Sequence, residues 1–183
     1  SHSLYRAIKQ LHPEAQLDVM APDWCRPMLT RMPEVDNAIR MPLGHGELKL
    51  GVRWRLGREL AGQYDWAITQ PNSLKSALIP FFAGIKKRSG WKGESRYGLL
   101  NDLRDNKTDF PLMVDRYRAL AWSKEKVKTA KDLPTLLPPK LQFDPENRQK
   151  ALKQHQLNKE RPILALCPGA EFGPAKRWPE EHY

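Results

Sequence analysis

The sequence has few of the features that mark secreted, metal-binding or membrane-spanning proteins. Its 183 residues include only two cysteines, Cys25 and Cys167, which lie far apart in the chain. A disulfide framework or a zinc site would need more ligands at closer spacing. No apolar run approaches the ~20 residues of a membrane span, and the first residues do not resemble a secretory signal. We therefore expect a soluble protein from a reducing, cytoplasmic setting.

Self-contained catalytic motifs are also missing. The sequence has no HExxH, CxxC or GxSxG pattern, which excludes the commonest zinc hydrolase, redox and serine hydrolase signatures. Asp65, Asp102 and Asp105 show no paired spacing that would nominate a catalytic carboxylate. His45, between two glycines, is a candidate general acid or base, but an exposed or structural loop histidine explains it more simply. We expect no metal site and no cofactor.

Positively charged residues are in excess. Thirty-one Lys and Arg residues against twenty-one Asp and Glu residues give a net charge of +10. This excess predicts an anionic partner or surface. Nucleic acid, anionic lipid and phosphorylated small molecules all remain open at this level, because composition does not choose among them.

Short apolar runs alternate with segments of helical periodicity, which predicts an α/β fold with a doubly wound parallel sheet. Asp23 is expected to cap a short helix, and Asn72 or Ser73 to cap the next long one. A weaker edge strand is expected at 141–143. The main expected strands are 17–21, 38–41, 66–69 and 85–89, and the main expected helices are 1–12, 50–60, 73–83, 111–122 and 144–156.

Ligands on such sheets bind at the carboxyl ends of the strands, which directs attention to 70–75 and 88–96. Asn72, Ser73 and Lys75 follow one expected strand and offer an amide, a hydroxyl and an ammonium group to a sugar or phosphate. Arg88 offers a bidentate fork for a carboxylate or phosphate. Simple helix capping and a solvated basic edge are the structural alternatives.

A second candidate site lies near the end of the chain. An apolar run, 163–167, is bounded by prolines and is typical of a buried parallel strand. The following loop contains Gly169 and Ala170, which allow close approach of a ligand, and the basic pair Lys176 and Arg177. A strand, a small-residue loop and a helix starting near Trp178 together favour a phosphate site. An ordinary connection between strand and helix is the alternative.

The segment 133–139 contains three prolines and is the expected linker. We therefore expect an N-terminal domain at 1–132, a linker and connecting helix at 133–159, and the start of a second domain at 160–183. The chain opens without methionine, inside an expected helix, and stops soon after another begins. We expect a piece of a longer protein.

Several fragments resemble the lipopolysaccharide heptosyltransferases. The residues of the segment 168–179 favour the type II branch of this family over type I. The similarity covers nearly the whole chain and is weakest over 124–159. The fragments include DVMAP at 18–22, MPLGHG at 41–46, PNSLKSA at 71–77, RYGLLND at 96–102 and, most specifically, CPGAEFGPAKRWP at 167–179.

The resemblance implies an inverting GT-B glycosyltransferase of two Rossmann-like domains. It would move L-glycero-D-manno-heptose from ADP-heptose to the first heptose of the lipopolysaccharide inner core, using heptosyl-Kdo2-lipid A as acceptor. The N-terminal domain would hold the acceptor, and the C-terminal domain the donor. The donor diphosphate would lie at Gly169, Ala170, Lys176 and Arg177, with Lys176 offsetting the charge of the departing ADP without a bound metal.

The resemblance also implies that key parts lie outside this chain. The family's catalytic aspartate would precede Ser1, and the residues that hold adenine and heptose would follow Tyr183, so we expect no catalytic residue here and no activity from this piece alone. Separately from the resemblance, the excess of basic residues suggests peripheral contact with the cytoplasmic face of the inner membrane. The alternatives are a basic nucleic-acid-binding α/β domain, supported by charge and interleaved aromatics, and a related heptosyltransferase with another acceptor.

Overall fold

The computed structural model describes residues 1–44, 46–158, 160–170 and 173–182. The chain divides into two compact units, Ser1–Gln142 and Phe143–Tyr183. The first unit, called unit 1, contains both sheets and the hydrophobic core, and the second is called unit 2. Among the described residues, no helix is long and apolar enough to cross a bilayer.

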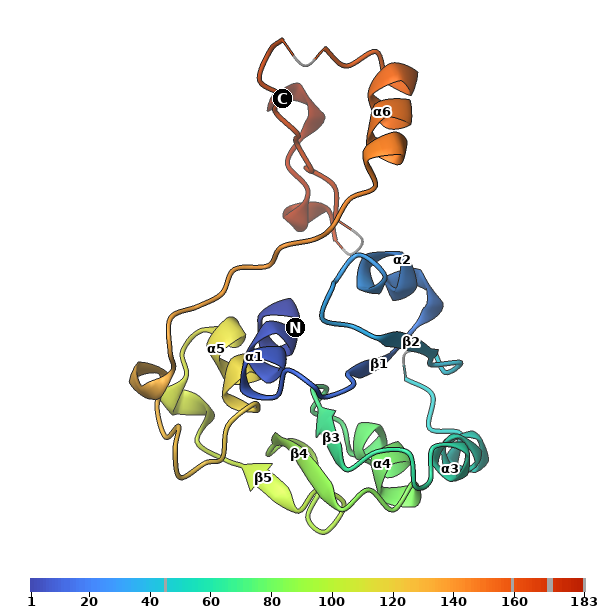
Figure 1. The fold of residues 1–183 in the computed structure, drawn as a ribbon, viewed down its shortest axis with the longest axis vertical. Coiled ribbons are helices and arrows are strands. Elements are labelled where there is room, and N and C mark those ends of the chain that lie inside the picture. The colour runs from blue at the N-terminus through green and yellow to red at the C-terminus, as the bar shows by residue number, and fades with distance from the viewer. Residues whose placement is uncertain (45, 159, 171–172, 183) are drawn as a thin grey trace. The chain divides into compact units, whose positions relative to one another are not determined.

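Unit 1 is built on two small parallel sheets (Figure 1). The first sheet has the order β1-β2, and the second has the order β3-β4-β5. Every pair of neighbouring strands is parallel, as predicted for an α/β fold. The strands are β1 (Asp18–Ala21), β2 (Asn37–Arg40), β3 (Trp66–Thr69), β4 (Lys87–Trp91) and β5 (Asp102–Arg104).

Helical segments connect β1 to β2, β2 to β3 and β3 to β4, and a loop without a helix joins the parallel strands β4 and β5. Helix α1 packs against α5, and α3 packs against α4 (Figure 1). Short 3-10 turns join several of the helices to the strands that precede them. The α-helices are α1 (His2–Leu11), α2 (Arg26–Leu29), α3 (Leu50–Glu59), α4 (Leu78–Phe82), α5 (Met113–Ala119) and α6 (Pro145–Gln154).

Helix α1 forms because its apolar residues recur at helical spacing. Leu4, Ala7 and Ile8 are buried on one face, whereas Leu11 at the end of the helix is partly exposed. This face meets aromatic and aliphatic residues from β4 and from the region around α5. The core includes Trp91, Phe110, Ala119, Leu120 and Val127.

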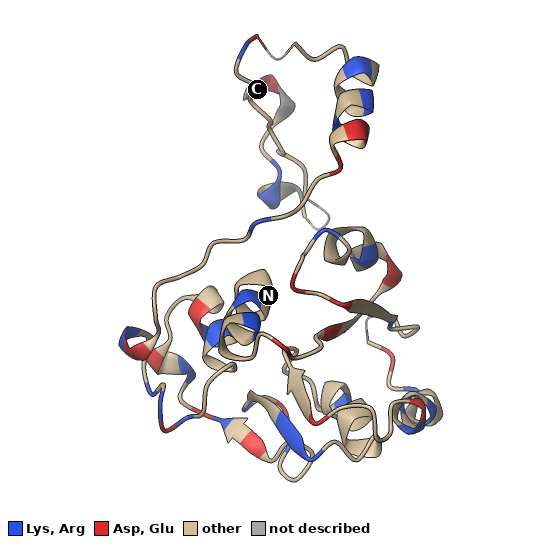
Figure 2. Cartoon of the chain, in the orientation of Figure 1, with Lys and Arg blue, Asp and Glu red and all other residues tan. Residues whose placement is uncertain are grey.

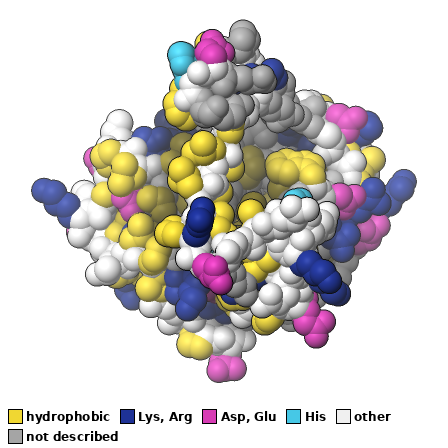
Figure 3. Space-filling model, turned by 90° about the horizontal axis from the view of Figure 1, so that it is seen from above, with side chains coloured by type: hydrophobic (Ala, Val, Ile, Leu, Met, Phe, Trp, Pro, Cys, Tyr) yellow, Lys and Arg dark blue, Asp and Glu magenta, His cyan; other side chains and the backbone are white. Residues whose placement is uncertain are grey.

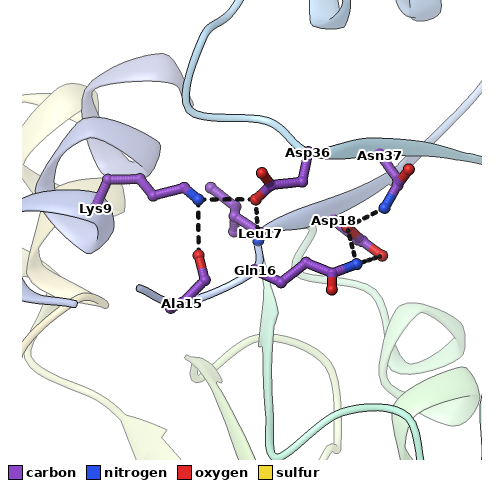
Figure 4. A network of polar contacts seen from close by, with 7 residues as sticks. All are labelled: Lys9, Ala15, Gln16, Leu17, Asp18, Asp36 and Asn37. Atoms are coloured by element: carbon purple, nitrogen blue, oxygen red, sulfur yellow. Dashed lines mark hydrogen bonds and ion pairs between the residues drawn. The ribbon is translucent and has the colours of Figure 1, made fainter. Parts of the chain in front are cut away.

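A polar network joins α1 to the first sheet (Figure 4). The Lys9 ammonium donates to the Asp36 carboxylate at 2.8 Å and to the Ala15 carbonyl at 2.7 Å. The same carboxylate accepts from the Leu17 backbone N–H at 2.7 Å. The segments just before β1 and β2 are thereby held together. The neighbouring Asp18 carboxylate accepts hydrogen bonds from the side chains of Gln16, Asn37 and Tyr64.

Three local predictions for unit 1 are wrong. Asp23 does not cap a helix: it lies inside a 3-10 turn, and its carboxylate pairs with Arg40 at 2.8 Å. The predicted helix 73–83 divides into a 3-10 turn at Leu74–Ala77 and the short α4. The predicted helix 111–122 is confined to α5, because the backbone is extended at Leu112 and turns after Ala119.

In unit 2, the Asp144 carboxylate accepts from the Glu146 N–H at 2.9 Å and caps α6, as predicted. The strand predicted at 163–167 does not form, and Ile163, Leu164 and Leu166 are at least half exposed. A parallel strand needs a neighbouring strand, and the described part of unit 2 has none. The weaker strand expected at 141–143 is also absent.

Candidate functional site

The carboxyl ends of β3, β4 and β5 bring together three loops of unit 1. The parallel register pairs Thr69 with Gly90 and Gly90 with Leu103, so the three strands end at one edge of the sheet. Asn72 follows β3, and Lys107 follows β5 in a 3-10 turn, Lys107–Asp109. This edge is where ligands bind on parallel sheets, and it is the candidate functional site.

Gly93 allows two of these loops to touch. A Cβ atom added at Gly93 would lie 2.2 Å from the Asn72 carbonyl oxygen, so no larger residue fits there. Next to it, the Glu94 N–H donates to the Asn72 carbonyl at 3.1 Å. The Glu94 carboxylate accepts from the Leu74 N–H at 2.8 Å. The Ser73 side chain makes no capping hydrogen bond. Glu94, from the loop after β4, caps this turn instead of the predicted Ser73.

The Asn72 side chain points toward the third loop. Its carbonyl oxygen accepts a hydrogen bond from the Lys107 ammonium at 3.3 Å. Partial burial is the main cause that lowers the pKa of Lys107 below its usual value, and the nearby charges of Arg96 and Arg116 lower that pKa further. The Lys107 ammonium is therefore a cation placed among other cations.

Arg96 is the buried cation of this site. Its side chain is 1% exposed, and it donates to the Pro71 carbonyl at 2.7 Å and to the Trp91 carbonyl. Its Nε has no hydrogen-bond partner in the described structure. Burial lowers the pKa of Arg96, and the Glu94 charge partly opposes this. The guanidinium holds the ends of β3 and β4 together and retains one unused donor.

These cations have little negative charge to offset them. Among the described residues, Arg96, Lys107 and Arg116 form no ion pair with a carboxylate. Clustered positive charge in a partly desolvated position attracts anions. No group of three potential metal ligands occurs in the described part of the chain. The edge of β3–β5 thus suits the carboxylate or phosphate groups of a ligand.

Lys75 lies one short turn beyond Asn72 and Ser73. Its side chain is partly exposed, and its charge acts on the nearby Glu47 carboxylate, whose pKa it helps to lower after the larger effects of Lys49 and the Gly44 N–H. Its backbone carbonyl accepts from the buried Arg53 guanidinium at 2.9 Å, which fixes the backbone at this position. The predicted group Asn72, Ser73 and Lys75 is therefore kept in one place.

Arg88 does not join this group. The sequence predicts a strand at 85–89 with Arg88 near its end, but β4 begins two residues later, so Arg88 is near its start. Its guanidinium donates to the carbonyls of Leu99 at 2.7 Å, Ile85 at 2.5 Å and Gly98 at 3.4 Å. These contacts hold the loop between β4 and β5. The assignment of Arg88 to a ligand stays a prediction that its contacts do not support.

The residues proposed for the donor lie in unit 2. Arg177 donates through Nε to the Ala170 carbonyl at 3.1 Å, and the Trp178 N–H donates to the Pro168 carbonyl at 3.3 Å. These bonds close the loop and bring Gly169 and Ala170 near the basic pair. Lys176 is exposed at the end of a 3-10 turn. His45 lies outside the described residues.

Sequence reasoning missed Lys107 and Arg116. They were missed because β5 was not predicted. This strand, Asp102–Arg104, is too short and too polar to show a recognisable strand pattern in the sequence. Had this strand been predicted, its carboxyl end would have drawn attention to Lys107. Arg96 was within the predicted region, but its burial had no signal in the sequence.

Comparison with known proteins agrees with this arrangement of parallel strands. Residues 53–183 match the family described as "Glycosyltransferase family 9 (heptosyltransferase)". The chain is 59% identical to lipooligosaccharide heptosyltransferase 2 of Haemophilus influenzae, covering 100% of this chain and 54% of that protein. It is 57% identical to lipopolysaccharide heptosyltransferase 2 of Escherichia coli, covering 100% and 53%. The chain thus spans about half the length of these curated relatives.

A solved structure, described as the structure of E. coli ADP-heptose lps heptosyltransferase II, matches with a TM-score of 0.88 and 53% identity. The match covers 100% of this chain and 54% of the solved one. The predicted fold class, α/β of GT-B type with parallel sheets, is thereby confirmed. The family match covers most of the chain and the relatives agree over all of it, so the chain belongs to glycosyltransferase family 9, the heptosyltransferase family.

Proposed function

We propose that this chain is part of an enzyme that moves L-glycero-D-manno-heptose from ADP-heptose to the first heptose of the lipopolysaccharide inner core. The observation that carries the proposal is the group of cations without carboxylate partners at the carboxyl ends of β3–β5. The names of the relatives, lipopolysaccharide and lipooligosaccharide heptosyltransferase 2, give the sugar and the acceptor class.

The proposed acceptor is heptosyl-Kdo2-lipid A, a sugar chain that carries carboxylate and phosphate groups. Asn72, Ser73 and Lys75 would contact its hydroxyl and anionic groups from the end of β3. Lys107 would meet an anionic group from the end of β5, because it is already directed at Asn72. Ammonium and amide groups at such an edge favour an oxygen-rich ligand over an apolar one.

The proposed donor is ADP-heptose, with its diphosphate at the closed loop of unit 2. Gly169 leaves open space for a phosphate, since no atom of the described residues lies within 4 Å of a Cβ added there. The Ala170 backbone, Lys176 and Arg177 would surround it. Lys176 would stabilise charge on the departing ADP directly. We propose that the reaction needs no metal and no cofactor.

We also propose a cytoplasmic location with peripheral contact to the anionic face of the inner membrane. The net charge of +10 and the lipid-linked acceptor support this contact. Nucleic acid is not a proposed partner.

The test is heptose transfer by the full-length polypeptide that contains this chain. The variant Lys107→Met should raise KM for the acceptor by roughly tenfold while KM for ADP-heptose stays unchanged, because one charge-assisted contact is lost. Lys131→Met, which removes an exposed lysine, is the control and should change neither constant.

Absence of transfer from ADP-heptose to the heptosylated acceptor would contradict the proposal. So would binding of an oligonucleotide of matched charge as tightly as the acceptor, at ~0.15 M salt, where distant surface charges are screened. Equally tight oligonucleotide binding would mean that these cations attract any polyanion and do not form a specific acceptor site.

A further inference from the structure

Helix α3 presents large apolar side chains to solvent and buries an arginine. Leu50 is 52% exposed and Trp54 is 55% exposed, whereas Arg53 is only 4% exposed. Leu50, Trp54 and the exposed Arg58 are spaced four residues apart, so they form one outward ridge. This is the reverse of the usual distribution on a surface helix.

The inward face of α3 is fixed by close contacts. The Arg53 guanidinium donates to the carbonyls of Glu47 at 2.8 Å, Leu48 at 2.6 Å and Lys75 at 2.9 Å. One turn later, Gly57 meets α4, where an added Cβ atom would lie 2.6 Å from the Phe82 Cβ. The helix therefore cannot rotate to bury Trp54 without breaking three hydrogen bonds and a tight helix contact.

The outward ridge is bordered by positive charge. Arg58 ends the ridge, Arg55 is exposed beside it, and Lys49, just before the helix, is exposed and pairs with the Glu47 carboxylate at 2.8 Å. Glu59 is the one acid within the helix, at its last residue (Figure 2). Leu48, just before the helix, is 48% exposed and extends the apolar surface. Exposed apolar side chains also occur elsewhere on the molecule (Figure 3), but this group combines tryptophan, leucine and several cations on one helix face.

We propose that the surface formed by Leu48, Leu50 and Trp54, with Lys49, Arg55 and Arg58 around it, docks on an anionic lipid bilayer. Tryptophan and leucine enter the boundary between headgroups and acyl chains, and the cations contact headgroup phosphates. The charge of this border selects an anionic lipid surface rather than a neutral apolar partner. The inference deepens the membrane contact under the proposed function and does not depend on the identity of the transferred sugar.

The test is co-sedimentation of the full-length polypeptide with vesicles of phosphatidylcholine, with and without phosphatidylglycerol, at ~0.15 M salt. The double variant Leu50→Ser/Trp54→Ser should bind the anionic vesicles roughly tenfold more weakly, from the loss of apolar insertion. The matched control is Leu112→Ser/Met113→Ser, which removes two side chains that are 62% and 56% exposed on another part of unit 1. It should bind like the parent.

The variant Arg55→Gln/Arg58→Gln should lose most of the preference for anionic over neutral vesicles. Parent-like vesicle binding by the Leu50→Ser/Trp54→Ser variant, or an equal loss in the control, would overturn the proposal. So would strong protection of Trp54 from acrylamide quenching without vesicles, judged against Trp54→Phe, because another protein surface would then cover it. Circular dichroism of each variant checks that the fold is retained.

Transfer to a water-soluble, deacylated acceptor separates this inference from the proposed function. The Leu50→Ser/Trp54→Ser variant should retain parent activity on that acceptor while losing vesicle binding. If the parent binds vesicles through α3 but transfers no heptose to either acceptor, the proposed function fails and the docking surface stands.

Discussion

The Arg53 guanidinium donates to the backbone carbonyl of Lys75 at 2.9 Å, so a helix after β2 fixes the position of a candidate ligand residue after β3. Two more carbonyls, from Glu47 and Leu48, depend on the same side chain. The three hydrogen bonds are partly buried, so water replaces the guanidinium only in part when the side chain is removed. The arginine is structural for α3 and indirectly positions Lys75.

Arg53→Leu should therefore lower the free energy of unfolding by about 1–3 kcal/mol, since it leaves three partly buried carbonyls without their donor. Denaturant titration of the full-length polypeptide measures this. Arg55→Leu, on the exposed face of the same helix, should change the free energy by less than about 0.5 kcal/mol. Equal effects of the two variants would show that the buried contacts do not matter.

Gly93→Ala should disrupt the candidate site as well as stability. The added methyl group would lie 2.2 Å from a backbone oxygen of Asn72, which cannot move without displacing the end of β3. We expect a loss of about 2–4 kcal/mol in stability together with weaker acceptor binding. Gly51→Ala is the control, because no atom of the described part of the chain lies within 4 Å of a Cβ added there and alanine favours a helix by up to about 1 kcal/mol. A mild Gly93→Ala phenotype in both measurements would be inconsistent with the contact.

Asp36 should make the free energy of unfolding depend on pH in the acidic range. The Leu17 N–H, followed by Lys9, lowers the pKa of Asp36 below its usual value. A lowered carboxylate pKa in the folded state stabilises the fold above the unfolded pKa of ~3.9, and this contribution is lost as pH falls through the folded pKa. Asp36→Asn should thus be less stable than the parent at pH 7, by a small amount because the group is partly exposed.

Denaturant titrations of the parent and Asp36→Asn at several pH values measure this dependence. The difference in stability should shrink as pH falls below ~4, because both proteins then carry a neutral side chain there. A difference that stays constant between pH 7 and pH 3 would mean that the carboxylate charge has no part in it.

Lys107 should make acceptor binding sensitive to alkaline pH. Burial, and then the charges of Arg96 and Arg116, lower its pKa. The ammonium group is lost as pH rises through this lowered pKa, so affinity should begin to fall before the ordinary lysine value of ~10.4. Acceptor binding measured from pH 7 to pH 10 should decline in the parent and be weak and flatter in Lys107→Met. A parallel decline in both would assign the titration to another group.

The sequence was sufficient for features that depend on local pattern. The apolar runs of β1 and β3 and the helical spacing in α1 predicted those elements close to their observed bounds. The Asp144 cap of α6 was also predictable, because capping needs only nearby residues. The end of β3 then predicted Asn72 and Lys75 as candidate ligand residues.

Features that depend on distant neighbours were not predictable. Strand β5 forms because it pairs with β4 and because Arg104 is buried, where it donates to the Trp122 and Val127 carbonyls. Lys107 reaches Asn72 across 35 positions of sequence. For the run 163–167 the error is the opposite one, because a strand was predicted and does not form. An apolar pattern becomes a strand only when a neighbouring strand is available.

Four arginines among the described residues are buried, and one of them, Arg118, also pairs with the Asp115 carboxylate. The other three, Arg53, Arg96 and Arg104, donate their hydrogen bonds to main-chain oxygens. Such an arginine recognises the path of the backbone and is indifferent to the identity of the residues that supply the oxygens. The positions around them should therefore accept varied side chains in a mutational library, as long as each peptide keeps its orientation. The same library should reject almost every replacement of the arginines themselves.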